Sequence, residues 1–344
     1  MLKHQQFLCL FLCQNLNTLV QLHRLILKKT KLEHMQFNWK SGNACTFNLE
    51  IEGVDSITEN EDVLTPLEYF KFFFSEHLFN VIVEESNTYS FQKFGKPLNL
   101  TTSELASFIP IELWMGIVKL PAFPDYWSNT MDYDKISTIM PLKRYQRILN
   151  SIHFMNNDNY NPNDRFSKVR PFLDIIRRNC LSQNQPNQFS VDEMMIPYKG
   201  KKAGSRRQYI KSKPKKWGFK FFIRAEVNGC IYDFLPYGGE STFNNIHFSD
   251  VEHKYFGLGP KVVLALASTI PNKPLSTMYF DNFFTTPELI HHLRKEYGIL
   301  SLGTVRQNRL RNCPLLDDKK LKKKGRGSYS YKCDKKKKLT LLNG

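Results

Sequence analysis

The 344-residue sequence lacks the features that mark disulfide-rich, zinc-binding and membrane-spanning proteins. Its 7 cysteines are scattered, odd in number and never spaced C-x-x-C, so they support neither a disulfide framework nor a zinc site, and they fit a reducing compartment. The longest apolar runs, residues 7–13 and 262–267, fall far short of the roughly 18 residues that a membrane span requires. No small-residue cleavage site follows the first run, so we expect no secretory signal and no membrane partner.

What the sequence does contain is apolar, aromatic and basic. Apolar residues make up 41%, aromatic residues 13% and charged residues 24%, a profile typical of a globular protein, and the length suits roughly two domains. The chain has 49 Lys and Arg against 32 Asp and Glu, a formal net charge of +17. This balance predicts a polyanionic partner, with nucleic acid favoured over an anionic membrane.

The excess positive charge lies in two segments. Residues 199–220 contain ten basic side chains, no acidic one, and the interleaved Tyr209 and Trp217, which suits contact with a nucleic-acid backbone. A solvated basic hairpin is the alternative. In residues 305–344, with fourteen basic and three acidic side chains, a nuclear-import signal or a flexible tail explains the charge as well as DNA contact does. The nucleic-acid-binding residues predicted from the first segment are Lys199, Lys201, Lys202, Arg206, Arg207, Lys211, Lys213, Lys215 and Lys216.

Residues 61–186 have the apolar spacing of helices. Thr65 is expected to cap a first helix, a capping box from Thr101 to Glu104 opens a second, and Pro141 opens a third. Apolar stripes of this kind form a core more often than a binding surface, so this helical region alone indicates no function.

From residue 188 the spacing changes to that of strands. Strands are expected at residues 189–197, 220–227, 231–236, 277–281 and 299–305. A helix, or a loop ending in a helix, is expected at 253–267, and a further helix after residue 286. The order βββ-α-β-α-β is that of the ribonuclease H-like fold, in which the first and fourth strands lie side by side, and a plain α/β domain is the alternative. We therefore predict the α/β class, with a ribonuclease H-like mixed sheet preceded by a helical domain.

That topology would bring together two carboxylates that are far apart in the sequence. Asp192 lies on the first predicted strand and Asp281 at the end of the fourth. Adjacent carboxylates repel unless a divalent cation lies between them, and oxygen ligands favour magnesium or manganese. A single Asp in a strand is more often structural, so a turn or a buried hydrogen-bonded role stays open from spacing alone.

Six strings in one order resemble the piggyBac transposase family. They are LPAFPDYWS at 120–128, RYQRILNSIHF at 144–154, SVDEMMIPYKG at 190–200, KPKKWGFK at 213–220, YFDNFFT at 279–285 and GTVR at 303–306. The resemblance implies that Asp192 and Asp281 are the first and second catalytic aspartates and ligands of Mg²⁺ or Mn²⁺. It further implies a core that cuts and joins DNA strands, double-stranded DNA with TTAA ends as partner, a homodimer and location in the nucleus.

Two features of that family are missing from the sequence. The first is the family's third catalytic aspartate, which lies in a W-x-D-N string after an insertion domain. The second is the cysteine-rich, zinc-binding tail that follows this string. Residues 325–334 resemble the inside of the insertion domain. We therefore expect an irregular or disordered lead at 1–60, a helical dimerisation and DNA-binding domain at 61–186, a catalytic core at 187–306 and a truncated, partial basic insertion domain at 307–344.

The expected function is that of a piggyBac transposase-derived DNA-binding protein. Its ancestral activity would be magnesium-dependent DNA strand cleavage and transfer, and the chain itself would be catalytically defective, with weak metal binding at most. The alternative is an active transposase or nuclease, whose third ligand would come from Glu193, Glu240 or Asp250 or from a chain that continues beyond Gly344. A non-functional remnant is the third interpretation.

Overall fold

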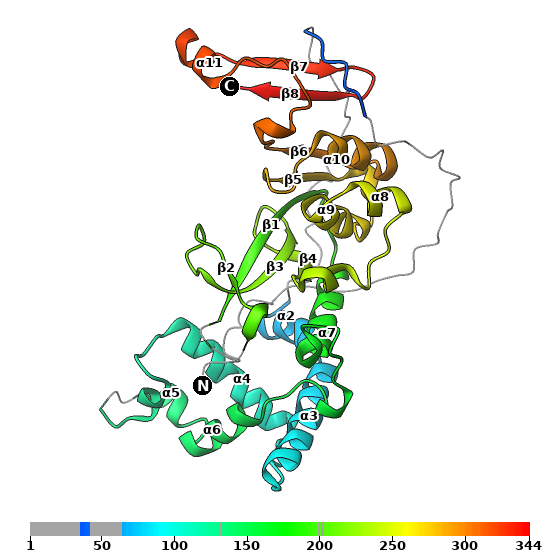
Figure 1. Cartoon of the computed structure of the whole chain (residues 1–344). Helices are drawn as coiled ribbons and strands as arrows, with labels where there is room; N and C mark the ends of the chain where they lie inside the picture. The colour runs from blue at the N-terminus through cyan, green and yellow to red at the C-terminus, as the bar shows by residue number, and fades with distance from the viewer. Residues whose placement is uncertain (1–34, 42–63, 131–132, 199, 201–202) are drawn as a thin grey trace.

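The structure is a computed structural model that describes residues 35–41, 64–130, 133–198, 200 and 203–344. Helices gather at one end of the molecule, a sheet lies in the middle and a small hairpin lies at the other end (Figure 1). The helices before the sheet are α2 Pro66–Phe73, α3 Glu76–Phe94, α4 Thr102–Ile117, α5 Asp134–Ser137, α6 Leu142–Ser151 and α7 Arg170–Leu181.

Capping side chains decide where these helices begin. Thr65 caps α2 as predicted, and Ser75 caps the next helix, α3. Thr101 caps α4, but the carboxylate of Glu104 does not complete the predicted capping box: it accepts hydrogen bonds from Arg144 on α6. The Glu104 carboxylate therefore links α4 to α6 and does not cap the N-terminus of α4.

The helices pack around an aromatic core. Tyr145 on α6 is fully buried, with its ring 5.3 Å from that of Phe108 and 4.9 Å from that of Trp127. Its hydroxyl donates to Oε1 of Glu112 (2.6 Å), a carboxylate that is itself only 2% exposed. Glu112 is thus an ionisable group inside an otherwise apolar core.

The sheet is mixed and follows the predicted strand order. Its strands are β1 Gln188–Pro197, β2 Gln208–Tyr209, β3 Trp217–Ala225, β4 Ile231–Pro236, β5 Thr277–Phe280 and β6 Leu300–Gly303. They are arranged β2-β3-β1-β5-β6, with β4 also paired to β3. β1 runs antiparallel to β3 and parallel to β5, which confirms that the first and fourth predicted strands are neighbours. The short β2, inside the basic segment, was not predicted.

Helices that follow β4 cover one face of the sheet. They are α8 Asp250–Tyr255, α9 Leu258–Ser268 and α10 Pro287–His292, the last continued by a π-helix at Leu293–Tyr297. The stretch 253–267, expected to form a helix or a loop ending in a helix, contains parts of two helices, because Ser249 caps α8 and the chain leaves the helical conformation at Phe256 and Gly257. Val262 and Leu266 of α9 are fully buried in one cluster with Phe189 of β1.

A buried network of charged groups ties α7 to the sheet. Arg177 Nε donates to Asp233 Oδ1 (2.6 Å), and the Thr269 hydroxyl donates to Asp233 Oδ2 (2.7 Å). Next to them Arg224, which is fully buried, donates through Nη1 to Gln185 Oε1 (2.7 Å). Helix α7, strands β3 and β4 and the end of α9 therefore share one set of polar contacts.

The last part of the chain forms a separate two-stranded sheet. It contains α11 Asp318–Lys324, β7 Ser330–Asp334 and β8 Leu339–Asn343, so residues 330–343 are not the flexible tail considered as an alternative. Lys40 exchanges two backbone hydrogen bonds with Cys333 (3.0 and 3.1 Å), and the Asn38 N–H donates to Asp334 Oδ2 (2.8 Å). Residues 35–41 thus lie against β7; the remainder of the lead expected at 1–60 falls outside the described residues.

No helix in the described part of the chain has the length and apolar character needed to cross a membrane.

Glu112→Gln should remove a pH dependence of the stability. Burial raises the pKa of Glu112 from 4.5 to about 7, although the hydrogen bond from Tyr145 opposes this. The folded protein then holds this proton more tightly than the unfolded chain, so stability is highest below the unfolded pKa and falls by about 3 kcal/mol as the pH rises to the folded pKa. Urea denaturation from about pH 4 to pH 8 should show this fall in the parent and in Glu84→Gln, an exposed control, but not in Glu112→Gln. An equal decrease in stability in the parent, Glu84→Gln and Glu112→Gln would contradict this assignment of the pH dependence to Glu112.

Candidate metal and nucleic-acid site

Asp192 and Asp281 reach neighbouring positions, Asp192 within β1 and Asp281 directly after β5. The parallel register of β1 and β5 ends with Val191 opposite Phe280, and in each case the next residue in the sequence is one of the two aspartates. Val191 and Phe280 are buried in the core beneath α9, so alternation turns both aspartates away from it, and both are exposed. The structure therefore brings the two predicted metal ligands together.

The turn that carries Asp281 is held by hydrogen bonds. The Phe283 N–H donates to Asp281 Oδ1 (2.8 Å), and the Thr285 hydroxyl donates to the Asp281 carbonyl (2.7 Å). Arg309 Nη1 donates to the carbonyls of Asn282 (3.0 Å) and Thr285 (2.9 Å). Arg309 is therefore a positioning residue for Asp281 that the sequence did not indicate.

Glu193 is next to Asp192 but on the opposite side of β1. Its Oε2 is buried and has no hydrogen-bond partner in the described part of the chain, and burial together with the charge of Asp192 raises its pKa. Nearby, Lys220 lies over the rings of Phe222 (4.6 Å) and Phe283 (4.8 Å), and burial lowers its pKa. Glu193 and Lys220 thus lie on the face of the sheet opposite Asp192.

A contact that the sequence did not reveal joins the basic segment to Asp192. Lys213 Nζ lies 3.3 Å from Asp192 Oδ2 and donates to the Glu193 carbonyl (2.8 Å). The sequence indicated Lys213 only as a nucleic-acid contact.

The two aspartates fit a divalent ion, but as a partial site. Among the residues that the structure describes, no three or more His, Cys, Asp or Glu side chains lie together as a metal site would need. Asp192 and Asp281 supply hard oxygen ligands at neighbouring positions of β1 and β5, which suits magnesium or manganese with water in the remaining coordination positions. Of the suggested third ligands, Glu193 is on the other side of β1 and Asp250 opens α8.

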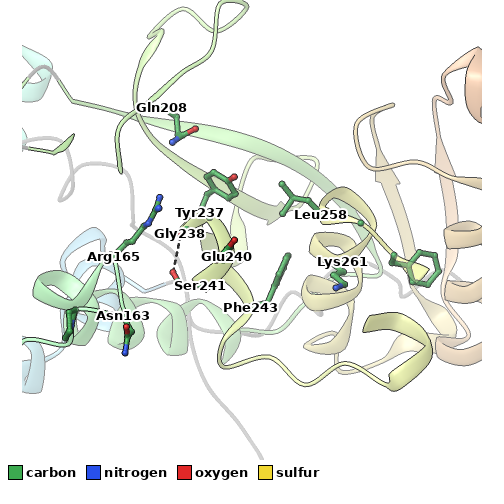
Figure 2. Close-up of a pocket in the computed structure, with 14 residues that line it drawn as sticks. Asn163, Arg165, Gln208, Tyr237, Gly238, Glu240, Ser241, Phe243, Leu258 and Lys261 are labelled. Carbon is green, nitrogen blue, oxygen red and sulfur yellow. Dashed lines mark hydrogen bonds between the residues drawn. The ribbon is translucent and has the colours of Figure 1, made fainter. Parts of the chain in front are cut away.

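The other suggested ligand, Glu240, lies in a pocket of about 780 Å³ (Figure 2). Arg165 and Lys261 line this pocket with Glu240, and Gln208 of β2 stands at its edge. Glu240 therefore belongs to this pocket and forms no carboxylate cluster with the aspartates.

The predicted nucleic-acid-binding residues centre on the hairpin of β2 and β3, which we call the basic hairpin (residues 206–217). The Arg207 guanidinium lies 4.2 Å from the centre of the Trp217 ring, which is 4.9 Å from that of Tyr209. Tyr209 and Trp217 are 50% and 47% exposed, a large exposure for aromatic rings. The side chains of Lys211, Lys215 and Lys216 are exposed in the loop between the strands.

Besides Arg207, two members of the predicted set have protein partners. Arg206 donates to the carbonyls of Ala203 (3.2 Å) and Arg165 (3.3 Å), and Lys213 contacts Asp192. Lys199, Lys201 and Lys202 fall outside the described residues.

Comparison with known proteins now identifies the family. A family model described as Transposase IS4 matches residues 65–343. The human PiggyBac transposable element-derived protein 3 is 33% identical over 276 residues, which cover 78% of this chain and 44% of that protein. The human PiggyBac transposable element-derived protein 2 is 32% identical over 278 residues, covering 79% and 45%. The chain belongs to the piggyBac transposase family.

A solved member of this family has the same fold. The cryo-EM structure of a piggyBac transposase synaptic complex with hairpin DNA matches with a TM-score of 0.64 and 20% identity, over 79% of this chain and 58% of that one. This chain spans less than half the length of the two human relatives.

Manganese binding should depend on Asp281. Isothermal titration of the parent should show one weak site, because two carboxylates leave much of the coordination sphere to water. Asp281→Ala removes one of the two protein ligands and should weaken binding by at least about tenfold. Asp250→Ala, which removes a carboxylate from the start of α8, is the control and should bind like the parent. If the two variants bind manganese equally well, the metal assignment is wrong.

Proposed function

We propose that this chain is a transposase-derived protein that binds duplex DNA through the basic hairpin. The observation that carries the proposal is the pairing of three exposed lysines, Lys211, Lys215 and Lys216, with exposed aromatic rings on the same hairpin. Lysines neutralise phosphates and release counterions, while aromatic rings pack on sugars or bases. Contacts of this kind give affinity and orientation with little dependence on sequence.

The proposal extends to Asp192 and Asp281 as the remaining ligands of an ancestral catalytic site. They would hold magnesium or manganese, which when bound helps to ionise an attacking oxygen and to stabilise negative charge on a phosphate. The protein itself contributes the orientation of Asp281, through Thr285 and Arg309. With two carboxylates, we expect a polypeptide of these 344 residues to bind DNA without cutting it.

A second candidate function is DNA strand cleavage and transfer. The adjacent positions of Asp192 and Asp281 favour it, since they match the first two aspartates of the family. It requires a further ligand for the metal, which the described residues do not place beside the pair.

Family membership supports the finer parts of the proposal. We propose double-stranded DNA with TTAA ends as the ligand, a homodimer as the assembly and the nucleus as the location. Residues 61–186 would serve dimerisation and DNA binding, 187–306 would be a ribonuclease H-like core, and 307–344 would correspond to part of the basic insertion. The related transposase was solved in a complex with hairpin DNA, which is consistent with DNA as partner.

Neutralising the loop of the basic hairpin should flatten the salt dependence of DNA binding. In a Lys211, Lys215 and Lys216→Gln triple variant, the slope of log affinity against log salt should fall by about 0.9 for each lysine that contacts a phosphate. Filter binding at several salt concentrations measures it. The comparison variant carries Lys71, Lys119 and Lys143→Gln, which removes the same charge from exposed positions before the sheet. A slope for the hairpin variant equal to that of the parent would mean that the hairpin is only a solvated basic face.

The 344-residue polypeptide should not nick or join a labelled duplex that contains TTAA, even with manganese. Two carboxylates leave a second ion without fixed ligands, and the electrostatic stabilisation that dominates phosphoryl transfer is then lost. The assay is run beside Asp192→Asn. Metal-dependent product from the parent that disappears in the variant would show that the second candidate function is correct.

A further inference from the structure

Lys213 is placed where a bound cation would interact with Asp192. Its ammonium contacts Asp192 Oδ2 at 3.3 Å and the Glu193 carbonyl at 2.8 Å, so it meets two oxygens of the site at once. The loop that carries it is closed by a hydrogen bond from the Ile210 N–H to the Lys216 carbonyl (2.8 Å). Lys213 therefore connects the loop of the basic hairpin to Asp192.

Lys213 and a divalent ion would compete for Asp192, because both are cations that bind the same carboxylate. The carboxylates of Asp192 and Asp281 carry two formal negative charges and the Lys213 ammonium carries one positive charge, which leaves a formal net charge of −1. Release of Lys213 would change this to −2, the charge that balances a divalent ion. Metal binding and the contact of Lys213 with Asp192 therefore oppose each other.

Of Lys213 and Lys220, Lys213 is the one that can move. Lys220 is enclosed by aromatic rings, including Tyr237 at 5.6 Å. Lys213 is on a surface loop, in a pair whose side chains are 26% and 56% exposed, and partly exposed ion pairs are weak. Its ion pair can therefore be exchanged for another at little cost.

We propose that Lys213 is an internal cation that holds Asp192 until a divalent ion displaces it, and that it then binds a DNA phosphate with the rest of its loop. Metal binding and DNA binding thereby favour each other, since each removes Lys213 from the same carboxylate. This inference rests on the proposed function, because it requires the metal site at Asp192 and Asp281. Lys213 is a positioning residue in this scheme.

The first test is manganese affinity, measured by isothermal titration in the absence of DNA. Lys213→Met should bind manganese about two- to fivefold more tightly than Lys215→Met, which removes the same charge from an exposed position of the loop. Lys213→Arg keeps the cation and should bind like the parent. Equal affinities for the two Met variants would overturn the inference, provided that Asp281→Ala weakens binding. If Asp281→Ala has no effect, the proposed metal site fails, and the inference fails with it.

The second test is the salt dependence of binding to a TTAA duplex in the presence of manganese. Lys213→Met should lower the slope by about 0.9, as Lys215→Met does, because both lysines then contact phosphates. A slope equal to that of the parent for Lys213→Met, with the expected decrease for Lys215→Met, would show that Lys213 stays on Asp192 and would overturn the inference. That outcome would leave DNA binding by the hairpin intact.

Discussion

The two-sided pairing of β1 is the constraint on which the site depends. β1 is antiparallel to β3, which starts in the basic hairpin, and parallel to β5, which leads into Asp281. A shift of one residue between β1 and β5 would turn Asp192 toward the core and Glu193 outward, because side chains alternate along a strand. The positions of the aspartates and of the lysine loop therefore follow from one register, which the apolar residues Phe189 and Val191 maintain by their burial.

The helices before the sheet are connected to this register through buried charge. Asp233 has no exposed surface and accepts hydrogen bonds from Arg177, Thr269 and the Phe234 N–H. Arg224 is opposite Asp233 in the pairing of β3 with β4, and burial lowers its pKa to about 10. Charges buried in this way are costly unless every partner is present, so α7 must stay docked on the sheet.

Local sequence patterns predicted most of the fold, because they act over a few residues. Two examples are the capping of α2 by Thr65 and the strand order, from which β1 and β5 were predicted to be neighbours. The patterns could not show that Glu104 would pair with Arg144, because a capping carboxylate has the same sequence signature whichever partner it finds. The contacts of Lys213 with Asp192 and of Arg309 with the Asp281 turn also join residues that are far apart in the sequence. Local periodicity therefore could not predict them.

The contact between residues 35–41 and β7 has a consequence for the order of folding. Lys40 and Cys333 are 293 residues apart, so their pairing closes nearly the whole chain into one loop. Closure over such a distance loses more chain entropy than any strand pairing within the central sheet, where partners are closer in sequence. During synthesis β7 emerges only after the central sheet and its helices, and domains fold as they emerge. Residues 35–41 therefore pair with β7 only after the sheet and its helices have formed. Until then their backbone groups are hydrogen-bonded to water.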